Sequence, residues 1–147
     1  MTRCAEWACA CPSHLRDGRP VSRFDLLVGI VGPCGSGKST LVAGLTAKGY
    51  RCRHIAQEHS GVPAMWSIMT RPDVLVYLEV SFETSTRRRH LSWTRRDYEN
   101  EISRLANARQ HAHLVIPTDA LDPGAVLQTC LDFLARREAA LREREGN

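Results

Sequence analysis

The sequence predicts an α/β protein, a three-layer α/β/α sandwich with a small, mostly parallel sheet. Apolar runs at residues 24–31, 73–80 and 113–117 contain few charged side chains, which is typical of parallel strands buried on both faces. Segments with apolar residues at helical spacing lie between these runs. Strands that alternate with helices along a chain favour a parallel sheet with helices on both faces.

The length and composition of the chain predict one domain. Of its 147 residues, 43% are hydrophobic and 24% are charged, as in ordinary soluble domains. We expect a flexible extension at residues 1–23, the domain at 24–136, and a charged, fraying helix end at 137–147. No apolar run reaches the roughly 18 residues of a membrane span, and the first 23 residues lack the apolar centre of a signal peptide. A cytoplasmic location is therefore the expectation.

A glycine-rich segment, which we call the phosphate loop, follows the first apolar run. It fits the pattern G-x-x-x-x-G-K-[ST] at every defined position. Its residues are Gly32, Pro33, Cys34, Gly35, Ser36, Gly37, Lys38, Ser39 and Thr40. Residues 39–48 contain helix formers at helical spacing, with Gly49 at the position of a C-terminal cap. Because a strand precedes the pattern and a helix follows it, we expect the loop to bind the phosphates of a nucleotide.

The residue types of the phosphate loop indicate how it would bind phosphates. Glycines allow consecutive peptide N–H groups to point at one anion, and the N-terminus of the following helix adds unpaired N–H groups. We expect Lys38 to reach the β- and γ-phosphates and the Ser39 hydroxyl to ligate Mg²⁺. Thr40 is expected near the α-phosphate. The expected ligands are therefore Mg²⁺ and ATP or another NTP.

Three carboxylates are candidates for a role at the metal. Residues 50–56 have the pattern of a second, less buried strand, and Glu58 follows it in a polar cluster. If this strand neighbours the first, Glu58 would hold Mg²⁺ through water or accept a proton from a substrate hydroxyl. The alternative for Glu58 is an ordinary polar turn. Glu79, near the end of the next strand-like run, and Asp119, after the last run, compete for the metal role.

An arginine-dense segment, residues 81–110, contains seven arginines against four acidic residues. It is expected to form two helices, the second of which begins at the capping pattern Thr94–Asp97. Two helices with a break between them would close over a nucleotide, where arginines such as Arg88 neutralise charge on the transferred phosphoryl group. The alternative is a solvated helical face whose arginines pair with acids such as Glu101.

Cysteines occur at two places that invite a functional interpretation. Cys4, Cys9, Cys11 and His14 are candidate zinc ligands, but their spacing is not one that zinc sites use, so we interpret them as part of the N-terminal extension. Cys34 lies at a variable position of the phosphate loop. A helix N-terminus lowers thiol pKa values and would make Cys34 sensitive to oxidation, but we favour a small residue that simply fits the loop.

Several segments together look like the small nucleoside, nucleotide and shikimate-type kinases of the P-loop NTPase superfamily. They are the phosphate loop, the run at 72–80, and the pair Phe82-Glu83 that leads into residues 87–89. Thr118-Asp119 and the segment after it resemble the last strand, adenine-side loop and closing helix of that family. The resemblance covers about residues 24–135. It implies a shortened P-loop NTPase fold.

The resemblance also implies roles for individual residues. Lys38 and Ser39 would hold phosphates and Mg²⁺. Arg88 or Arg87 would belong to the lid over the nucleotide. Thr118 and Asp119 would lie near the adenine.

Two classes of function are open. The first is a small kinase that transfers the γ-phosphoryl group of ATP to a small-molecule acceptor, with Lys38, Glu58 and Arg88 as catalytic residues. Shikimate-type kinases carry acids at the end of their second strand, where Glu58 stands. The second is a nucleotide-binding module or slow NTPase that switches a partner, because residues 57–80 lack the Asp-Arg pair and the insertion of many family members. Phosphorylation of nucleic-acid ends is a weaker option, since a net charge of +4 is below the usual basic excess.

Overall fold

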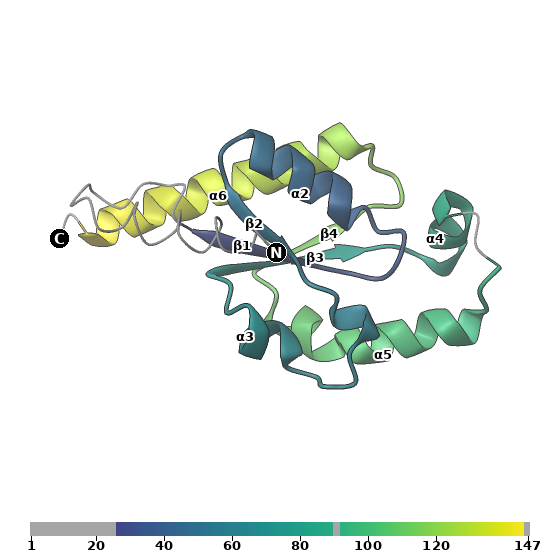
Figure 1. Cartoon of the computed structure of the whole chain (residues 1–147). Helices are drawn as coiled ribbons and strands as arrows, with labels where there is room; N and C mark the ends of the chain where they lie inside the picture. The colour runs from purple at the N-terminus through teal and green to yellow at the C-terminus, as the bar shows by residue number, and fades with distance from the viewer. Residues whose placement is uncertain (1–25, 90–91, 146–147) are drawn as a thin grey trace, which may run out of the picture.

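The computed structural model describes residues 26–89 and 92–145, and within these ranges it shows an α/β fold (Figure 1). In chain order the elements are β1 (Leu27–Val31), α2 (Lys38–Ala47), β2 (Arg51–His54), the 3₁₀ turn η2 (Gln57–His59), α3 (Met65–Met69), β3 (Val74–Glu79), α4 (Phe82–Arg89), α5 (Arg95–His111), β4 (Leu114–Pro117) and α6 (Pro123–Glu145). The expected extension at residues 1–23, with its candidate zinc ligands, lies outside the described residues.

The strands of the described residues form one four-stranded sheet in the order β2-β1-β3-β4. Every neighbouring pair is parallel, and β1 lies between β2 and β3, with Val28 opposite Cys52 on one side and Val74 on the other. The carboxyl ends of all the strands therefore lie at one edge of the sheet. The parallel α/β sheet that the sequence predicts is confirmed.

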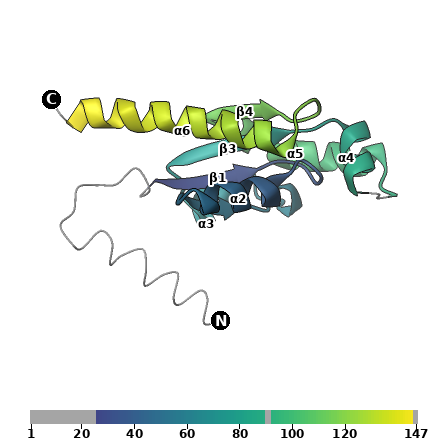
Figure 2. The same cartoon turned by 90° about the horizontal axis from the view of Figure 1, so that it is seen from above.

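Helices pack on both faces of this sheet (Figures 1 and 2). On one face α2 and α6 pack against each other, and on the other α3 and α5 lie below the strands. The expected α/β/α layering agrees with this arrangement. The short helix α4 lies at the end of the molecule toward which the strands run (Figure 1). No helix in the described part of the chain is long and apolar enough to span a membrane.

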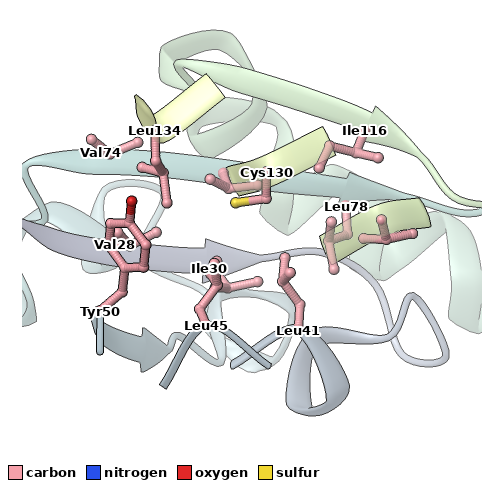
Figure 3. Close-up of a cluster of buried hydrophobic side chains, with 12 residues drawn as sticks. Val28, Ile30, Leu41, Leu45, Tyr50, Val74, Leu78, Ile116, Cys130 and Leu134 are labelled. Carbon is pink, nitrogen blue, oxygen red and sulfur yellow. The ribbon is translucent and has the colours of Figure 1, made fainter. Parts of the chain in front are cut away.

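Two apolar clusters join the helices to the sheet. The larger cluster, between the sheet and the pair α2 and α6, contains Val28, Ile30, Leu41, Leu45, Tyr50, Val74, Val76, Leu78, Ile116, Val126, Cys130 and Leu134 (Figure 3). The smaller cluster, on the α5 face, contains Val31, Ile55, Leu75, Tyr77, Leu105 and Ala108. Successive residues of a strand point to opposite faces, so β1 and β3 contribute to both clusters. This double burial explains their continuous apolar runs.

Two helix ends form as the sequence predicts. At the end of α2, the Gly49 N–H donates to the Thr46 carbonyl (3.0 Å) and the Tyr50 N–H donates to the Leu45 carbonyl (3.1 Å), which is the paired bonding of a glycine-terminated helix. At the start of α5, Thr94 and Asp97 form a capping box in which each side chain bonds the backbone of the other. Local signals therefore fix these boundaries.

Beyond Arg136 the C-terminal helix is solvated, as expected, except at one residue. Helix α6 continues to Glu145, and residues 139–144 are exposed. Glu138 is buried, with 6% of its surface exposed, and its Oε1 accepts a 2.8 Å hydrogen bond from the Tyr50 hydroxyl. A charged residue in this position is satisfied by a partner 88 positions earlier in the chain, which no local pattern reveals.

Candidate functional site

The phosphate loop lies at the carboxyl edge of the sheet, between the central strand β1 and α2. Gly35 and Gly37 have φ values of 81° and 96°, in a region that residues with a Cβ rarely adopt. A Cβ at Gly35 would also lie 3.0 Å from backbone atoms of Ser85 in α4. Gly37 is the N-cap of α2 and has no side chain to cap it. The first N–H groups of α2 are therefore available to a ligand.

Lys38 begins α2, and the loop encloses its ammonium group. Only 6% of its side chain is exposed. Nζ donates to the carbonyl oxygens of Gly32 (2.6 Å) and Pro33 (3.1 Å), and it forms an ion pair with Glu58. The ammonium group is therefore held inside the loop that leads into the N-terminus of α2, so the loop and the helix end both carry positive charge.

The position of β2 brings Glu58 to the loop. Because β2 pairs with β1, the turn η2 that follows β2 lies beside the residues that follow β1. The Glu58 side chain is 3% exposed; Oε2 pairs with Lys38, and Oε1 has no hydrogen-bond partner among the described residues. A buried carboxylate oxygen without a partner is costly unless a ligand, ion or water satisfies it. Glu58 therefore has room for one further interaction.

Glu58 and Ser39 fit the ligand preference of Mg²⁺. Both residues line one cavity beside the loop. Mg²⁺ prefers oxygen ligands and keeps several waters, so one hydroxyl and one carboxylate oxygen are a suitable protein contribution. The unpartnered Oε1 of Glu58 is the observation that supports this fit.

The other two candidate carboxylates make different contacts. Glu79 Oε2 accepts hydrogen bonds from Arg109 (2.9 and 3.1 Å). Asp119 Oδ1 accepts one from the Ser81 N–H (2.9 Å). Burial acts to raise the pKa of Asp119, but hydrogen bonds from Ser81 and Thr84 together with the charge of Arg88 lower it and prevail. Both line a separate cavity with Tyr98. Glu58 is the one of the three that contacts the lysine of the loop.

Arg88 connects the phosphate loop to the end of β4. Its guanidinium donates to the Gly35 carbonyl (3.2 Å) and to the hydroxyl (3.1 Å) and carbonyl (2.6 Å) of Thr118. Thr118 is buried, with 1% of its surface exposed. Arg87, the alternative lid residue, instead bonds a hydroxyl of its own helix (3.4 Å). The structure thus places Arg88, rather than Arg87, against the loop.

Two cavities open on either side of the start of α2. The α6-side cavity, of about 180 Å³, is lined by residues that include Ser36, Arg88, Thr118, Leu121 and Pro123. The β2-side cavity, of about 210 Å³, is lined by residues that include Lys38, Ser39, His54, Glu58, His59 and Arg89. Gly37 and Thr40 line both cavities, so an elongated ligand can extend across them. Asp119, expected near the adenine, does not line the α6-side cavity with Thr118.

Cys34 is held between two side chains that approach the loop. Its N–H donates to Glu101 Oε1 (2.9 Å), and its Sγ lies 3.8 Å from His59 Nε2. Burial, together with the hydrogen bond and charge of Glu101, raises the pKa of the Cys34 thiol to about 11. The net shift is upward, opposite to the direction that an oxidation-sensitive thiol at a helix N-terminus requires. Glu101 is also not a solvated partner of arginines, since it is 6% exposed and bonds the loop.

Several residues near the loop were not singled out from the sequence. His54 is the last residue of β2, and His59 belongs to the polar segment that follows this strand, which is a usable signal for His59. Desolvation and the charge of Lys38 lower the pKa of His54 below its usual value. Arg89 is the last residue of α4. Glu101, which the sequence analysis names only as an acid of the solvated alternative, lies on the buried face of α5 with Leu105 and Ala108.

Comparisons with models of protein families and with curated proteins found no match to this chain. What the chain itself provides is a glycine-rich loop, an enclosed ammonium group, a buried carboxylate and a guanidinium at the carboxyl edge of a parallel sheet. Such an edge is where open α/β sheets bind ligands.

Proposed function

We propose that the protein binds ATP and Mg²⁺ at the phosphate loop and is a small kinase that transfers the γ-phosphoryl group to a small-molecule acceptor. The observation that carries this proposal is the environment of Lys38. Its buried ammonium group bonds two loop carbonyls and pairs with Glu58, at the start of a helix that has no side-chain cap. A fixed cation beside unpaired N–H groups is suited to a polyphosphate.

In this proposal the nucleotide extends across the start of α2. The nucleoside occupies the α6-side cavity, where Leu121 and Pro123 offer apolar surface and Arg88 offers a planar cation. The phosphates cross Gly37 and Thr40, which line both cavities, and reach Lys38. This path would make the shortened P-loop NTPase fold, which the sequence implies, sufficient for one nucleotide.

Residues at the β2-side cavity would then serve the reacting end of ATP. Ser39 and Glu58 would hold Mg²⁺, which when bound neutralises charge on the β- and γ-phosphate oxygens. Lys38 and Arg88 would stabilise the charge that develops during transfer. Arg89 lines the same cavity and would pair with an anionic group of the acceptor. Oε1 of Glu58, which has no partner in the part of the chain that the structure describes, would alternatively accept the proton of an acceptor hydroxyl.

A nucleotide-dependent switch is the second candidate. Between β2 and β3 the chain has only the turn η2 and a helix of five residues, which leaves little chain for an acceptor domain. Val62, Ile68 and Met69 of this segment are 53%, 60% and 71% exposed. The segment follows Glu58 directly, so a partner that packs on these apolar side chains would be linked to the nucleotide site.

Measuring ADP formation with and without a panel of small hydroxyl and phosphate compounds separates the two functions. The kinase requires turnover that depends on both Mg²⁺ and an acceptor, with the phosphorylated acceptor detected by mass spectrometry. Glu58→Gln is expected to lower turnover by about 100-fold or more, the usual contribution of a positioned acid or base. Glu79→Gln, the matched control at the end of β3, should keep the wild-type rate.

Each contrary outcome identifies the step at fault. Slow hydrolysis that no acceptor accelerates favours the switch. A loss of Mg²⁺-dependent turnover in Glu79→Gln, but not in Glu58→Gln, contradicts the metal ligand. No turnover and no nucleotide binding in any condition contradicts the phosphate loop itself.

A further inference from the structure

Three side chains with different donor atoms meet beside the phosphate loop. They are Cys34 of the loop, His59 at the end of η2, and Glu101 in the middle of α5. The Cys34 Sγ and His59 Nε2 lie 3.8 Å apart, and the sulfur, a ring nitrogen and a carboxylate oxygen all lie within 4.8 Å of one another. Residues from three separate elements therefore present one sulfur, one nitrogen and one oxygen to a common point.

Glu101 is the member of the cluster that the fold alone does not explain. It is 6% exposed, and among the described residues no lysine or arginine forms an ion pair with it. Its hydrogen-bond partners within the described chain are both neutral groups of one residue, the N–H and the thiol of Cys34. Burying a carboxylate without a cation is costly. A positive ion at the cluster would supply the missing charge.

The donor set selects the kind of ion. Thiolate and imidazole are ligands for Zn²⁺ and similar transition metals, whereas Mg²⁺ prefers oxygen. Zn²⁺ binds sulfur at about 2.3 Å and nitrogen or oxygen at about 2.0–2.2 Å, so tetrahedral ligand atoms lie about 3.3–3.8 Å apart. The Sγ–Nε2 separation already agrees with this range. If the exposed His59 ring and the Glu101 carboxylate rotate so that their ligand atoms move by about 1 Å, the remaining separations also fall within this range.

We propose that Cys34, His59 and Glu101 form a Zn²⁺ site with three protein ligands and one open position. The hydrogen bond from the Cys34 N–H orients the Glu101 carboxylate, as partners of metal ligands commonly do. Cys34 and His59 also line the β2-side cavity with Lys38. The open position therefore faces the space beside the phosphate loop, where it accepts a water molecule or an anionic ligand. The site shares the β2-side cavity with Ser39 and Glu58 but uses none of their oxygens, and it does not depend on ATP binding.

Titration with Co²⁺, a spectroscopic substitute for Zn²⁺, tests the site directly. Cobalt bound to a thiolate gives a charge-transfer absorption band that oxygen and nitrogen ligands do not give. The starting protein is the full chain with Cys4, Cys9 and Cys11 replaced by serine, so that N-terminal thiols cannot produce the band. We expect one Co²⁺ per chain, displaced by one Zn²⁺, and no band in Cys34→Ser.

Variants of the other ligands and a control cysteine complete the test. His59→Gln and Glu101→Gln should each weaken Zn²⁺ binding by more than about 10-fold, since loss of even an outer-shell partner costs about 10–100-fold. Cys52→Ser, the control in β2, should leave the band and the affinity unchanged. Circular dichroism checks that each variant is folded.

The proposal is overturned if the starting protein gives no thiolate band, or if the band persists in Cys34→Ser. If Cys34→Ser or Glu101→Gln does not fold, His59→Gln decides the matter, because His59 is exposed and its loss should not disturb the core. Unchanged Zn²⁺ affinity in a folded His59→Gln variant overturns the proposal as well.

Discussion

Replacing Lys38 should destabilise the fold mainly because of the carboxylate that it leaves behind. The side chains of Lys38 and Glu58 are 6% and 3% exposed, so their ion pair is almost fully buried. In Lys38→Met, the buried Glu58 carboxyl group loses the ammonium group that pairs with Oε2, while its Oε1 already has no partner in the described chain. Breaking a buried pair in this way costs about 3–5 kcal/mol of the free energy of unfolding.

The double variant Lys38→Met/Glu58→Gln gives the sharper test. Because it removes both charges, it should be more stable than Lys38→Met alone, even though it carries one more substitution. Glu58→Gln alone should cost about 1–3 kcal/mol, since the Lys38 ammonium keeps its two carbonyl acceptors. Lys48→Met, at the exposed end of α2, should stay within about 0.5 kcal/mol of the wild type.

Urea unfolding followed by circular dichroism measures all four variants under the same conditions. The reasoning is refuted if the double variant is no more stable than Lys38→Met, because the loss would then come from the missing lysine contacts. It is also refuted if Lys38→Met unfolds at the same urea concentration as Lys48→Met.

Three further predictions concern the loop and its neighbours. Arg88→Ala should weaken ATP binding by about 10-fold, because a charged hydrogen bond worth about 1.5 kcal/mol is lost. Arg87→Ala is the control and should leave the affinity for ATP unchanged, with both affinities measured by calorimetry. Gly35→Ala should lower the free energy of unfolding more than Gly37→Ala. Both positions have positive φ, but of the two only Gly35 would place the methyl group 3.0 Å from the backbone of α4. Equal midpoints of urea unfolding would contradict this prediction. Folding raises the pKa of Cys34 from 9.0 to about 11, so the folded state binds the thiol proton more tightly than the unfolded state. The free energy of unfolding should therefore decrease as the pH rises through that range. Iodoacetamide should therefore modify Cys34 at pH 8 about 100-fold more slowly than an unperturbed thiol, as judged by peptide mass spectrometry, and modification at the unperturbed rate would contradict the burial argument.

The fold was predictable where one element carries its own signal. β1 and β3 are apolar along their whole length because each packs into both clusters, and this double burial is visible in a single stretch of sequence. The Thr94 capping box and the Gly49 helix end depend on residues within a few positions of each other. The phosphate loop combines a fixed pattern with such neighbours.

What the sequence did not reveal depends on partners far apart in the chain. Glu58 was tied to the loop only on the condition that β2 neighbours β1, which is a property of strand order. Under the alternative of a solvated helical face Glu101 would pair with arginines, but its partner, the Cys34 N–H, is 67 positions away. The buried Glu138 likewise depends on Tyr50. In each case a charged side chain is buried by tertiary contacts, which override the local preference for solvent.

Calorimetric titration with ATP and Mg²⁺ tests the central claim, that Lys38 and its loop bind the phosphates of a nucleotide. The comparison is between folded Glu58→Gln, which retains the lysine, and Lys38→Met/Glu58→Gln, with Lys48→Met as the control. We predict saturable binding of one ATP in the wild type, Glu58→Gln and Lys48→Met, and binding at least about 10-fold weaker in the double variant. Equal affinity in Glu58→Gln and the double variant, or no ATP binding by the wild type, would contradict the claim.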